Sequence, residues 1–366
     1  METKSSLNLG VEVLSHMLNT SISSLIQKPK TALRTANQRL TDALSQPEIL
    51  SLLSNIWMTN ELHLLFADTG VGKSLLAVQI CDALSKGCNI FNFNMPSRSY
   101  RINFYDLELT DRQFLKRYTD DGGNLHGFSE NFLIDNIDFV ELVNENPKKS
   151  VEELIFNKIE KDLDIYKPDI IVIDNISFLN TQTTQETQTA LEVMRKLNDL
   201  KKKYGISILV LAHTPKRNLT QSLSINDLAG SKHLSNFADS ISAIGTSTLD
   251  SKFRYIKQIK PSRSSELIYD STNVITCELV KKDCLLGFEF IKCSSEKEHL
   301  MEKDEKRRIE DKNLANSLLG QGMTLREVAE KIGTSKSTIG RWKDELSQQS
   351  HNGIPGTAGQ TGHDDE

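Results

Sequence analysis

Short apolar runs alternate with longer amphipathic stretches through the middle of the chain. Continuous apolar strands separated by helices are typical of a parallel sheet that is covered on both faces. The sequence therefore predicts an α/β fold with a mostly parallel central sheet in residues 48–293. The apolar runs are Leu62–Phe66, Ile102–Leu107, Ile170–Ile173 and Ile206–Ala212, and the helical stretches between them include Lys73–Ser85 and Gln185–Lys203.

Further β-rich runs follow this alternating part. We expect them to form extra strands at the far edge of the sheet. They lie near Ser240–Thr246, Phe253–Ile259, Ser265–Tyr269 and Gly287–Ile291.

Residues 1–47 are rich in Ser and Thr and predict a helical arm. Apolar residues recur at loosely helical spacing in 14–26, and a second candidate helix is Thr31–Leu44. The favoured interpretation is an arm that packs on its own core or on a neighbouring subunit. Contact with DNA or a membrane is a weaker alternative.

The composition changes sharply after residue 293. From Glu296 to Lys312, 13 of 17 residues are charged, which predicts a solvated helix or linker at 294–312. An apolar-periodic unit follows at 313–346. The tail, 347–366, is rich in glycine and is expected to be disordered.

Charge and composition exclude several classes of protein. The chain has 366 residues, enough for about two domains, and its net charge is 44 − 49 = −5. This balance suits a globular protein and excludes a collagen-like chain or a uniformly basic nucleic-acid coat. Any contact with DNA must therefore come from a local basic patch.

Neither the cysteines nor the apolar segments indicate a secreted or membrane-spanning protein. The five cysteines contain no C-x-x-C pair and have no zinc-site spacing, so we expect free thiols in a reducing compartment. No stretch approaches the roughly 18 apolar residues of a membrane helix. The start, Met-Glu-Thr-Lys, lacks the features of a signal peptide. These features predict a cytoplasmic protein.

The first apolar strand runs into a phosphate-binding pattern. Residues 67–74 read Ala-Asp-Thr-Gly-Val-Gly-Lys-Ser, the Walker A pattern with Ala67 in place of its first glycine. Gly70 and Gly72 let consecutive backbone N–H groups face a phosphate. We expect Lys73 to reach the β- and γ-phosphates of ATP and Ser74 to bind Mg²⁺. The expected nucleotide-binding residues are Ala67, Asp68, Thr69, Gly70, Val71, Gly72, Lys73, Ser74 and Leu75.

Acidic residues at two other strand ends are candidates for metal binding and catalysis. Asp174 ends an apolar strand, as in Walker B, where a carboxylate holds Mg²⁺ through water. Asn175 follows it, so the base that orients the attacking water must come from elsewhere. Glu108, at the tip of another strand, is the favoured base. Asp106 is the competing base, and a helix-capping acid is the non-catalytic alternative.

The order of these motifs resembles the RecA/DnaB-type ATPases, and most closely the RepA-like AAA-family ATPases of bacterial plasmids and mobile elements. It runs from a P-loop to a strand ending in Glu, then to Walker B without an adjacent Glu, and last to a strand ending in a polar sensor. The resemblance covers roughly residues 48–346 and implies a RecA-like P-loop NTPase fold. It is carried by Leu62–Gln79, Asn103–Tyr118, Pro168–Phe178, Ile206–Lys216 and Asp227–Ile244.

The resemblance also implies roles for individual residues. Lys73 and Ser74 bind phosphate and Mg²⁺, Asp174 supports the metal, and Glu108 is the catalytic base. His213 matches the sensor that reports the γ-phosphate to a DNA-binding loop. A buried strand-end histidine bonded to backbone is the alternative for His213.

In RecA-like rings the loops after the sensor grip single-stranded DNA, which makes Lys216, Arg217 and Lys232 candidates. An ordinary surface loop is the alternative. Rings of this type complete each site with a basic finger from the neighbouring subunit, for which Lys260 and Arg263 are candidates. The family usually has a closer Lys-x-Arg pair, so a solvated basic turn stays open. A finger in trans implies a homo-oligomeric ring or filament, with a hexamer favoured.

The unit at 313–346 is expected to be a small all-α helix-turn-helix domain. Thr324 and Glu327 form a capping-box pattern, Gly333 ends that helix, and Ser335 caps the next. The second helix resembles the recognition helices of homeodomain-like units in resolvases and transposases. A protein-docking module is the alternative. The candidate DNA contacts are Ser335, Lys336, Ser337, Thr338, Arg341 and Lys343.

These patterns together predict an ATPase that uses ATP and Mg²⁺ and binds double-stranded DNA through the helix-turn-helix. Single-stranded DNA in a ring channel is a further expected partner. The favoured role is a replicative helicase or helicase-like motor of a plasmid or mobile element. A DNA-binding regulator that uses ATP as an assembly switch without unwinding is the second hypothesis. A small-molecule kinase is a distant third, because it leaves the C-terminal unit unexplained.

Overall fold

The computed structural model describes residues 33–91, 93, 95–137, 142–144, 147–176, 186–214, 220–228, 231–300 and 303–351. The chain divides into two units after Glu48. The described part of the first unit holds helix α2 (Ala36–Leu44), which Thr35 and Gln38 begin with a capping box. No residue of α2 is buried. The other predicted arm helix, in 14–26, lies outside the described residues.

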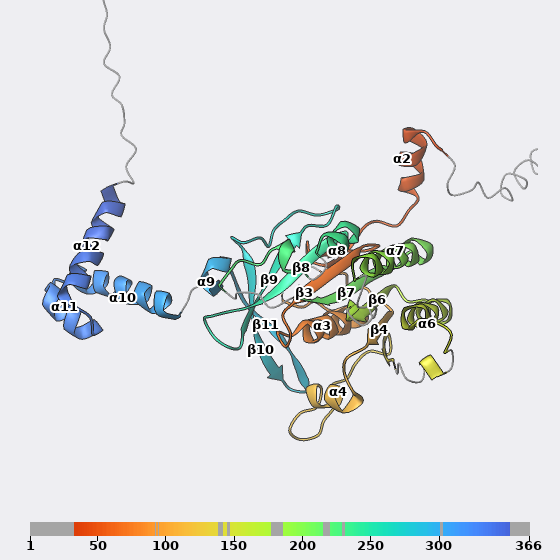
Figure 1. Ribbon diagram of the computed structural model, residues 1–366, viewed down its shortest axis with the longest axis horizontal. Coiled ribbons are helices and arrows are strands. Elements are labelled where there is room, and N and C mark those ends of the chain that lie inside the picture. Colours follow the sequence, from red (N-terminus) through yellow and green to blue (C-terminus); the bar gives the residue numbers. More distant parts are fainter. Residues whose placement is uncertain are drawn as a thin grey trace, which may run out of the picture. The chain divides into compact units, whose positions relative to one another are not determined.

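One nine-stranded sheet organises the second unit, in the order β11-β10-β9-β8-β3-β7-β6-β4-β5 (Figure 1). Neighbouring strands are parallel from β8 to β5 and antiparallel from β8 to β11. The predicted α/β class with a mostly parallel sheet is thus confirmed. The strands are β3 (Leu62–Ala67), β4 (Ile102–Asp106), β5 (Phe132–Asn136), β6 (Ile170–Asp174), β7 (Ser207–His213), β8 (Ser240–Thr246), β9 (Phe253–Lys260), β10 (Val274–Lys282) and β11 (Leu285–Ser294), and a separate pair is β1 (Ser51–Leu53) and β2 (Trp57–Met58).

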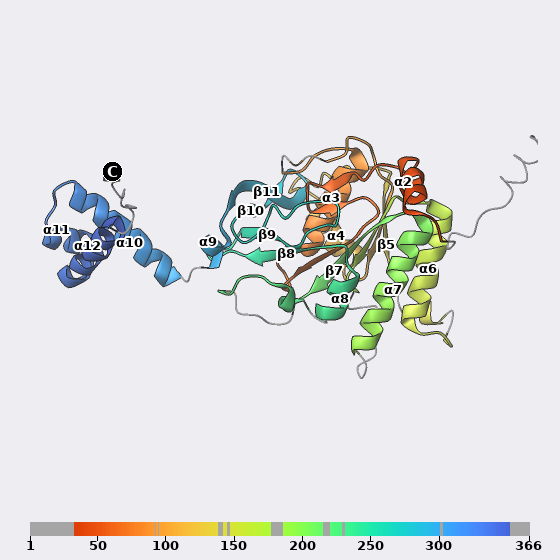
Figure 2. The same cartoon turned by 90° about the horizontal axis from the view of Figure 1, so that it is seen from above.

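Helices cover both faces of the sheet (Figure 2). Alternation along β3 explains why two cores form: Leu65 packs with α3 (Lys73–Lys86), whereas Leu64 packs with α6 (Val151–Tyr166) and α7 (Glu186–Tyr204). The central strands are buried on both faces, which is why they read as continuous apolar runs. The shorter helices of this part are α4 (Asp111–Arg117), η2 (Ile225–Asp227) and α8 (Ser231–Phe237).

The edge strands were only partly predictable. The expected strands at 240–246 and 253–259 are present as β8 and β9. The expected strand at 265–269 is wrong, because the backbone N–H groups of Ile268 and Tyr269 donate to the side chain of Gln258 instead of forming a ladder. Strand β10, which sequence analysis missed, pairs with β9 in its place.

The C-terminal part holds three packed helices, α10 (Lys303–Gly320), α11 (Leu325–Ile332) and α12 (Lys336–His351). Leu318, Val328, Ile339 and Trp342 are among the residues of its small core. The predicted capping box of Thr324 and Glu327 is present, and α11 ends at Gly333, whose φ is +77°. Glycine suits this left-handed position because a side chain there is strained.

The structure differs from the solvated helix or linker expected at 294–312 in its first part, whereas the exposed residues 308–310 of helix α10 agree with it. Strand β11 continues to Ser294, and helix α9 (Glu296–Leu300) follows it directly. Glu296 and His299 are 1% and 0% exposed, because each has polar partners inside the domain. The ATPase domain therefore extends to Leu300, and α10 contains residues 303–312 of the charged stretch.

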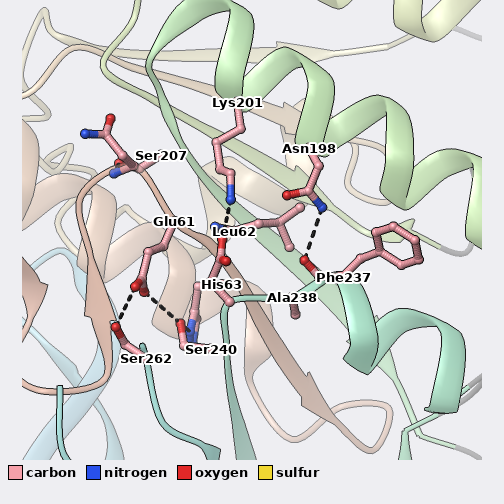
Figure 3. A network of polar contacts seen from close by, with 12 residues as sticks. Glu61, Leu62, His63, Asn198, Lys201, Ser207, Phe237, Ala238, Ser240 and Ser262 are labelled. Atoms are coloured by element: carbon pink, nitrogen blue, oxygen red, sulfur yellow. Dashed lines mark hydrogen bonds and ion pairs between the residues drawn. The ribbon is translucent and has the colours of Figure 1, made fainter. Parts of the chain in front are cut away.

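A buried polar network lies at the start of β3, where Glu61 accepts hydrogen bonds from Ser262 at 2.5 Å and Ser240 at 3.4 Å (Figure 3). His63 lies 2.8 Å from the hydroxyl oxygens of both Ser240 and Ser242. Burial raises the pKa of Glu61 and lowers the pKa of His63 to about 3. The network therefore holds a neutral imidazole on β3, the strand that leads into the P-loop.

Acid is expected to destabilise this domain in a way that depends on His63. An unfolded histidine takes up a proton near pH 6.5, whereas folded His63 does so near pH 3. Stability is therefore full above about pH 6.5 and falls below it, by up to about 1.4 kcal/mol per pH unit. Urea unfolding at pH 7, 6 and 5 measures how steeply the free energy of unfolding changes with pH. His63→Leu should make this dependence weaker. An equal pH dependence in both proteins would contradict the low pKa of folded His63.

Candidate active site

The P-loop joins the carboxyl end of β3 to the N-terminus of α3. Gly70 and Gly72 have φ values of +77° and +114°, and Gly72 is the N-cap of α3. A Cβ on Gly72 would lie 2.6 Å from Cζ of Phe288, so only glycine fits beneath this ring. Ala67, in the first glycine position, is the buried last residue of β3, where a methyl group fits. The loop thus has the strand–turn–helix context that its sequence predicted.

Lys73 is 5% exposed and points back across the loop. Its Nζ donates to the carbonyl oxygen of Ala67 at 3.1 Å and to Nδ1 of His213 at 2.9 Å. Burial lowers the pKa of Lys73, while the carboxylates of Asp174 and Glu108 act in the opposite direction. The ammonium group therefore lies among the predicted acidic residues.

Asp174, the last residue of β6, has a buried carboxylate that can bind a cation. It is 1% exposed, and neither carboxylate oxygen has a hydrogen-bond partner among the described residues. Burial raises its pKa to about 7; Ser74 faces it and acts to lower that pKa without closing a hydrogen bond. Two orphaned oxygens beside a hydroxyl fit Mg²⁺, which takes one or two protein ligands together with phosphates and water.

Glu108 and Asp106 have different surroundings, although both follow β4. The carboxylate of Glu108 contacts Nε2 of His213 at 3.0 Å and accepts a hydrogen bond from Nδ2 of Asn175. The carboxylate of Asp106 instead accepts the backbone N–H groups of Glu108 at 3.0 Å and Leu109 at 2.9 Å. Asp106 thus shapes the turn that presents Glu108.

His213, the last residue of β7, bridges the P-loop and the turn after β4. The ammonium group of Lys73 can only donate hydrogen bonds, so Nδ1 of His213 is the acceptor. The proton of the imidazole is therefore on Nε2, which donates it to the carboxylate of Glu108. One imidazole thus connects the phosphate-binding lysine with the candidate base. The alternative to a sensor, a strand-end histidine bonded to backbone, does not agree with these side-chain contacts.

Sequence analysis missed several contacts that support the site. Asn175 is 1% exposed and touches both Glu108 and His213. Nε of Arg254 donates to the carbonyl oxygen of Val71 in the P-loop at 3.0 Å. The position of Asn175 directly after Asp174 was a signal for its location, whereas nothing in the sequence indicated the role of Arg254.

The antiparallel pair of strands β10 and β11 also contacts the P-loop helix α3. The side-chain amide of Gln79 donates to the carbonyl oxygen of Phe288 at 2.8 Å and accepts its backbone N–H at 2.9 Å. This pair of bonds holds β11 against α3 and keeps the Phe288 ring over Gly72. Strand β11 therefore helps to fix the loop.

The two finger candidates differ in their contacts. Nζ of Lys260 donates to the carbonyl oxygens of Ser235 at 3.0 Å and Ala238 at 2.5 Å, at the end of α8. Arg263 is exposed, and in the described part of the chain it has no hydrogen bond or ion pair. Ser262, which lies between them in the sequence, donates a hydrogen bond to the carboxylate of Glu61.

The predicted single-stranded DNA contacts are only partly placed. Lys216 and Arg217 lie outside the described residues, and Lys232 lies in α8 with its side chain outside the description. Their roles stay predictions.

Comparison with known proteins identifies the family. The family model of the AAA domain, AAA_25, matches residues 28–218, which is more than half of the 366-residue chain. The chain belongs to this AAA-domain family. The matched region contains the P-loop, Glu108, Asp174 and His213, so a P-loop ATPase domain accounts for the site described above. It ends before Arg263 and the C-terminal helices.

A solved structure of a KaiC-like protein from the hyperthermophilic archaeon Pyrococcus horikoshii OT3 is similar at 14% identity. The match covers 66% of this chain and 93% of that chain, with a TM-score of 0.45. No curated protein matches the sequence. Within the described residues, no helix has the length and apolar character needed to cross a membrane.

Proposed function

We propose that this AAA-domain protein is an ATP-hydrolysing DNA motor, a replicative helicase or helicase-like ATPase of a plasmid or mobile element. One observation carries the proposal: the same chain combines the Lys73–His213–Glu108 contact chain with a C-terminal helix, α12, that exposes Lys336, Arg341 and Lys343. A P-loop site accounts for ATP turnover, and these cations supply a place for DNA.

In the proposed reaction, Lys73 and the N-terminus of α3 bind the phosphates, while Ser74 and Asp174 hold Mg²⁺. The metal, when bound, neutralises charge on the β- and γ-phosphates. Glu108 orients the attacking water and accepts its proton. Because His213 donates to Glu108, it holds the carboxylate in position, and it is placed to sense a γ-phosphate that competes for Lys73.

The proposed finger in trans is Arg263. Lys260 already donates to the carbonyl groups at the end of α8, a favourable place for a cation, so it has a role within its own subunit. Arg263 is exposed on a turn that Glu61 and Ser262 hold through a buried hydrogen bond. A finger supplied by a neighbour requires a homo-oligomer, and we favour a hexameric ring.

The C-terminal helices carry the proposed duplex-binding surface. Ile339 and Trp342 of α12 are buried, whereas Lys336, Ser337 and Arg341 are exposed. The hydroxyl of Ser335 accepts the backbone N–H of Thr338 at 3.1 Å and so caps α12 as predicted. A helix with cations for phosphates and hydroxyls for base edges suits the major groove.

Replacing two cations of α12 is expected to weaken duplex binding. Arg341→Ala with Lys343→Ala removes about two phosphate contacts, so the plot of log affinity against log salt should become shallower by about 2. Fluorescence anisotropy with a duplex at several KCl concentrations measures this slope. Arg326→Ala with Lys331→Ala removes the same charge from exposed positions on α11 and serves as the control. Equal slopes in the two double variants would point to a docking module.

An ATPase assay with and without DNA tests the proposed motor. A motor should turn over faster with single-stranded DNA and displace an annealed strand. Stimulation and displacement should both be lost in Lys73→Ala. Slow turnover that DNA does not stimulate, together with binding to one duplex sequence, would instead identify a regulator that uses ATP as an assembly switch. Mass measurement with ATP, run beside the assay, tests the ring.

A further inference from the structure

Asn175 is a buried polar residue to which the proposed reaction gives no role. It directly follows Asp174 at the end of β6 and is 1% exposed. Strand β6 lies between β4 and β7 in the sheet, so the amide of Asn175 reaches groups from both neighbours. Its Nδ2 contacts Oε1 of Glu108, which follows β4, and lies 2.8 Å from Nε2 of His213 at the end of β7.

Two N–H donors meet at one oxygen of Glu108. Nε2 of His213 lies 3.0 Å from Oε1 and carries the imidazole proton, because Nδ1 accepts from Lys73. Nδ2 of Asn175 donates to the same Oε1. The opposite orientation of the amide would bring its oxygen against Oε1, and two acceptors would then face each other. The amide nitrogen is therefore the group that faces Glu108.

The second carboxylate oxygen of Glu108, Oε2, has different surroundings. Within the described part of the chain Oε2 has no hydrogen bond or ion pair, and the side chain of Glu108 is 29% exposed. A carboxylate oxygen has two lone pairs, and two N–H groups already use those of Oε1. Oε2 is therefore the oxygen that a water molecule can approach.

We propose that Asn175 is a positioning residue, which together with His213 fixes Oε1 of Glu108 so that Oε2 accepts the proton of the attacking water. In this step the water oxygen bonds to the γ-phosphorus, the bond to the bridging oxygen breaks, and ADP leaves with that electron pair. The inference rests on the ATP hydrolysis proposed above, with Glu108 as its base, and is independent of any movement along DNA.

Physical reasons favour an anchor of this kind. Glu108 is exposed, and holding a glutamate side chain in one rotamer costs conformational entropy. Burial fixes Asn175, and its amide supplies a donor without adding a charge beside Asp174. A base displaced by about 1 Å can lose about 100-fold in rate, so a fixed donor at Oε1 bears directly on turnover.

Hydrolysis of ATP by the full-length protein, measured without DNA, tests the proposal. Asn175→Leu replaces the amide by an apolar group of similar size, and kcat should fall about 10-fold, as expected when a hydrogen bond to a carboxylate is lost. Affinity for a fluorescent nucleotide should change by less than about 2-fold, because the proposed phosphate contacts come from Lys73 and the P-loop. Asn103→Leu is the control: Asn103 is also buried, at 5% exposed, makes no hydrogen bond to Glu108 in the described structure, and should keep kcat within about 2-fold.

A Glu108→Ala background separates positioning from a purely structural effect. If Asn175 acts through Glu108, adding Asn175→Leu to Glu108→Ala should lower single-turnover hydrolysis by less than about 2-fold. Asn175→Ala removes the same donors without a branched side chain and should give the same pattern. An equal loss in both backgrounds, no loss with Glu108 present, or faster turnover would overturn the proposal. Missing stimulation or strand displacement by DNA would instead refute the motor and leave this comparison intact.

Discussion

Glu108→Gln is expected to retain ATP and lose ATP turnover by about two orders of magnitude or more, the usual contribution of a general base. The amide keeps the shape of the side chain but cannot accept the proton of the attacking water. Nucleotide affinity should change little, because the proposed phosphate contacts come from Lys73 and the P-loop. Fluorescent-nucleotide binding and single-turnover hydrolysis, measured on one preparation, separate the two effects.

Asp106→Asn is the matched control for Glu108→Gln, since it makes the same chemical change on the same turn. Asp106 accepts two backbone N–H groups and is 4% exposed, so its replacement should lower the thermal midpoint as well as turnover. Glu108 is exposed, so Glu108→Gln should leave the midpoint almost unchanged. If Glu108→Gln turns over normally while Asp106→Asn folds normally and is inactive, Asp106 is the base.

The strand ends explain how far the sequence could predict this site. The P-loop, Asp174 and His213 lie at the ends of β3, β6 and β7, which are parallel neighbours in the sheet. Parallel strands bring their carboxyl ends to one edge, so residues at those ends meet whatever the intervening sequence is. A motif at each end was therefore enough to predict the site, including Glu108 after β4.

Contacts between distant segments were not predictable in the same way. Gln79 meets the backbone of Phe288, and Arg254 meets the backbone of Val71, across separations of 209 and 183 residues. Their partners are carbonyl and N–H groups, which every residue has. No residue type or spacing therefore marks these pairs, and only the packing of the antiparallel edge strands brings them together.

The end of the ATPase domain was misplaced for another reason. Charged residues usually indicate a solvated segment, and 13 of the 17 residues in 296–312 are charged. The domain nevertheless buries Glu296 by pairing it with Lys257 at 2.6 Å. It also buries His299, which contacts the hydroxyls of Thr276, Ser294 and Ser247 at 2.8–3.0 Å. Composition cannot distinguish such residues from exposed ones.

Ending the chain at Ser294 is therefore expected to destabilise the ATPase domain, whereas ending it at Leu300 should not. The shorter chain loses Glu296 and leaves the ammonium group of Lys257, 8% exposed, without its counter-charge. Removing one partner of a buried ion pair costs about 3–5 kcal/mol. For a domain of this size that corresponds to a thermal midpoint lower by about 10 °C.

Differential scanning calorimetry of both truncated chains and the full chain measures the difference. The chain ending at Leu300 should match the ATPase domain of the full protein and bind ATP with the same affinity, while duplex binding is lost with the C-terminal helices. Equal midpoints for the two truncated chains would show that α9 contributes little to the domain.

A pair of full-length variants separates the ion pair from the rest of α9. Glu296→Gln should lower the midpoint, because the amide leaves the charge of Lys257 uncompensated. Adding Lys257→Met should restore much of the loss, since replacing both members of a buried pair is often neutral. Glu296 also accepts the backbone N–H of Leu223 at 2.7 Å, and Lys257 donates to its carbonyl oxygen at 2.7 Å. The pair thus fixes the segment that follows the predicted DNA-binding loop, so Glu296→Gln should also reduce stimulation by single-stranded DNA if that loop grips the strand.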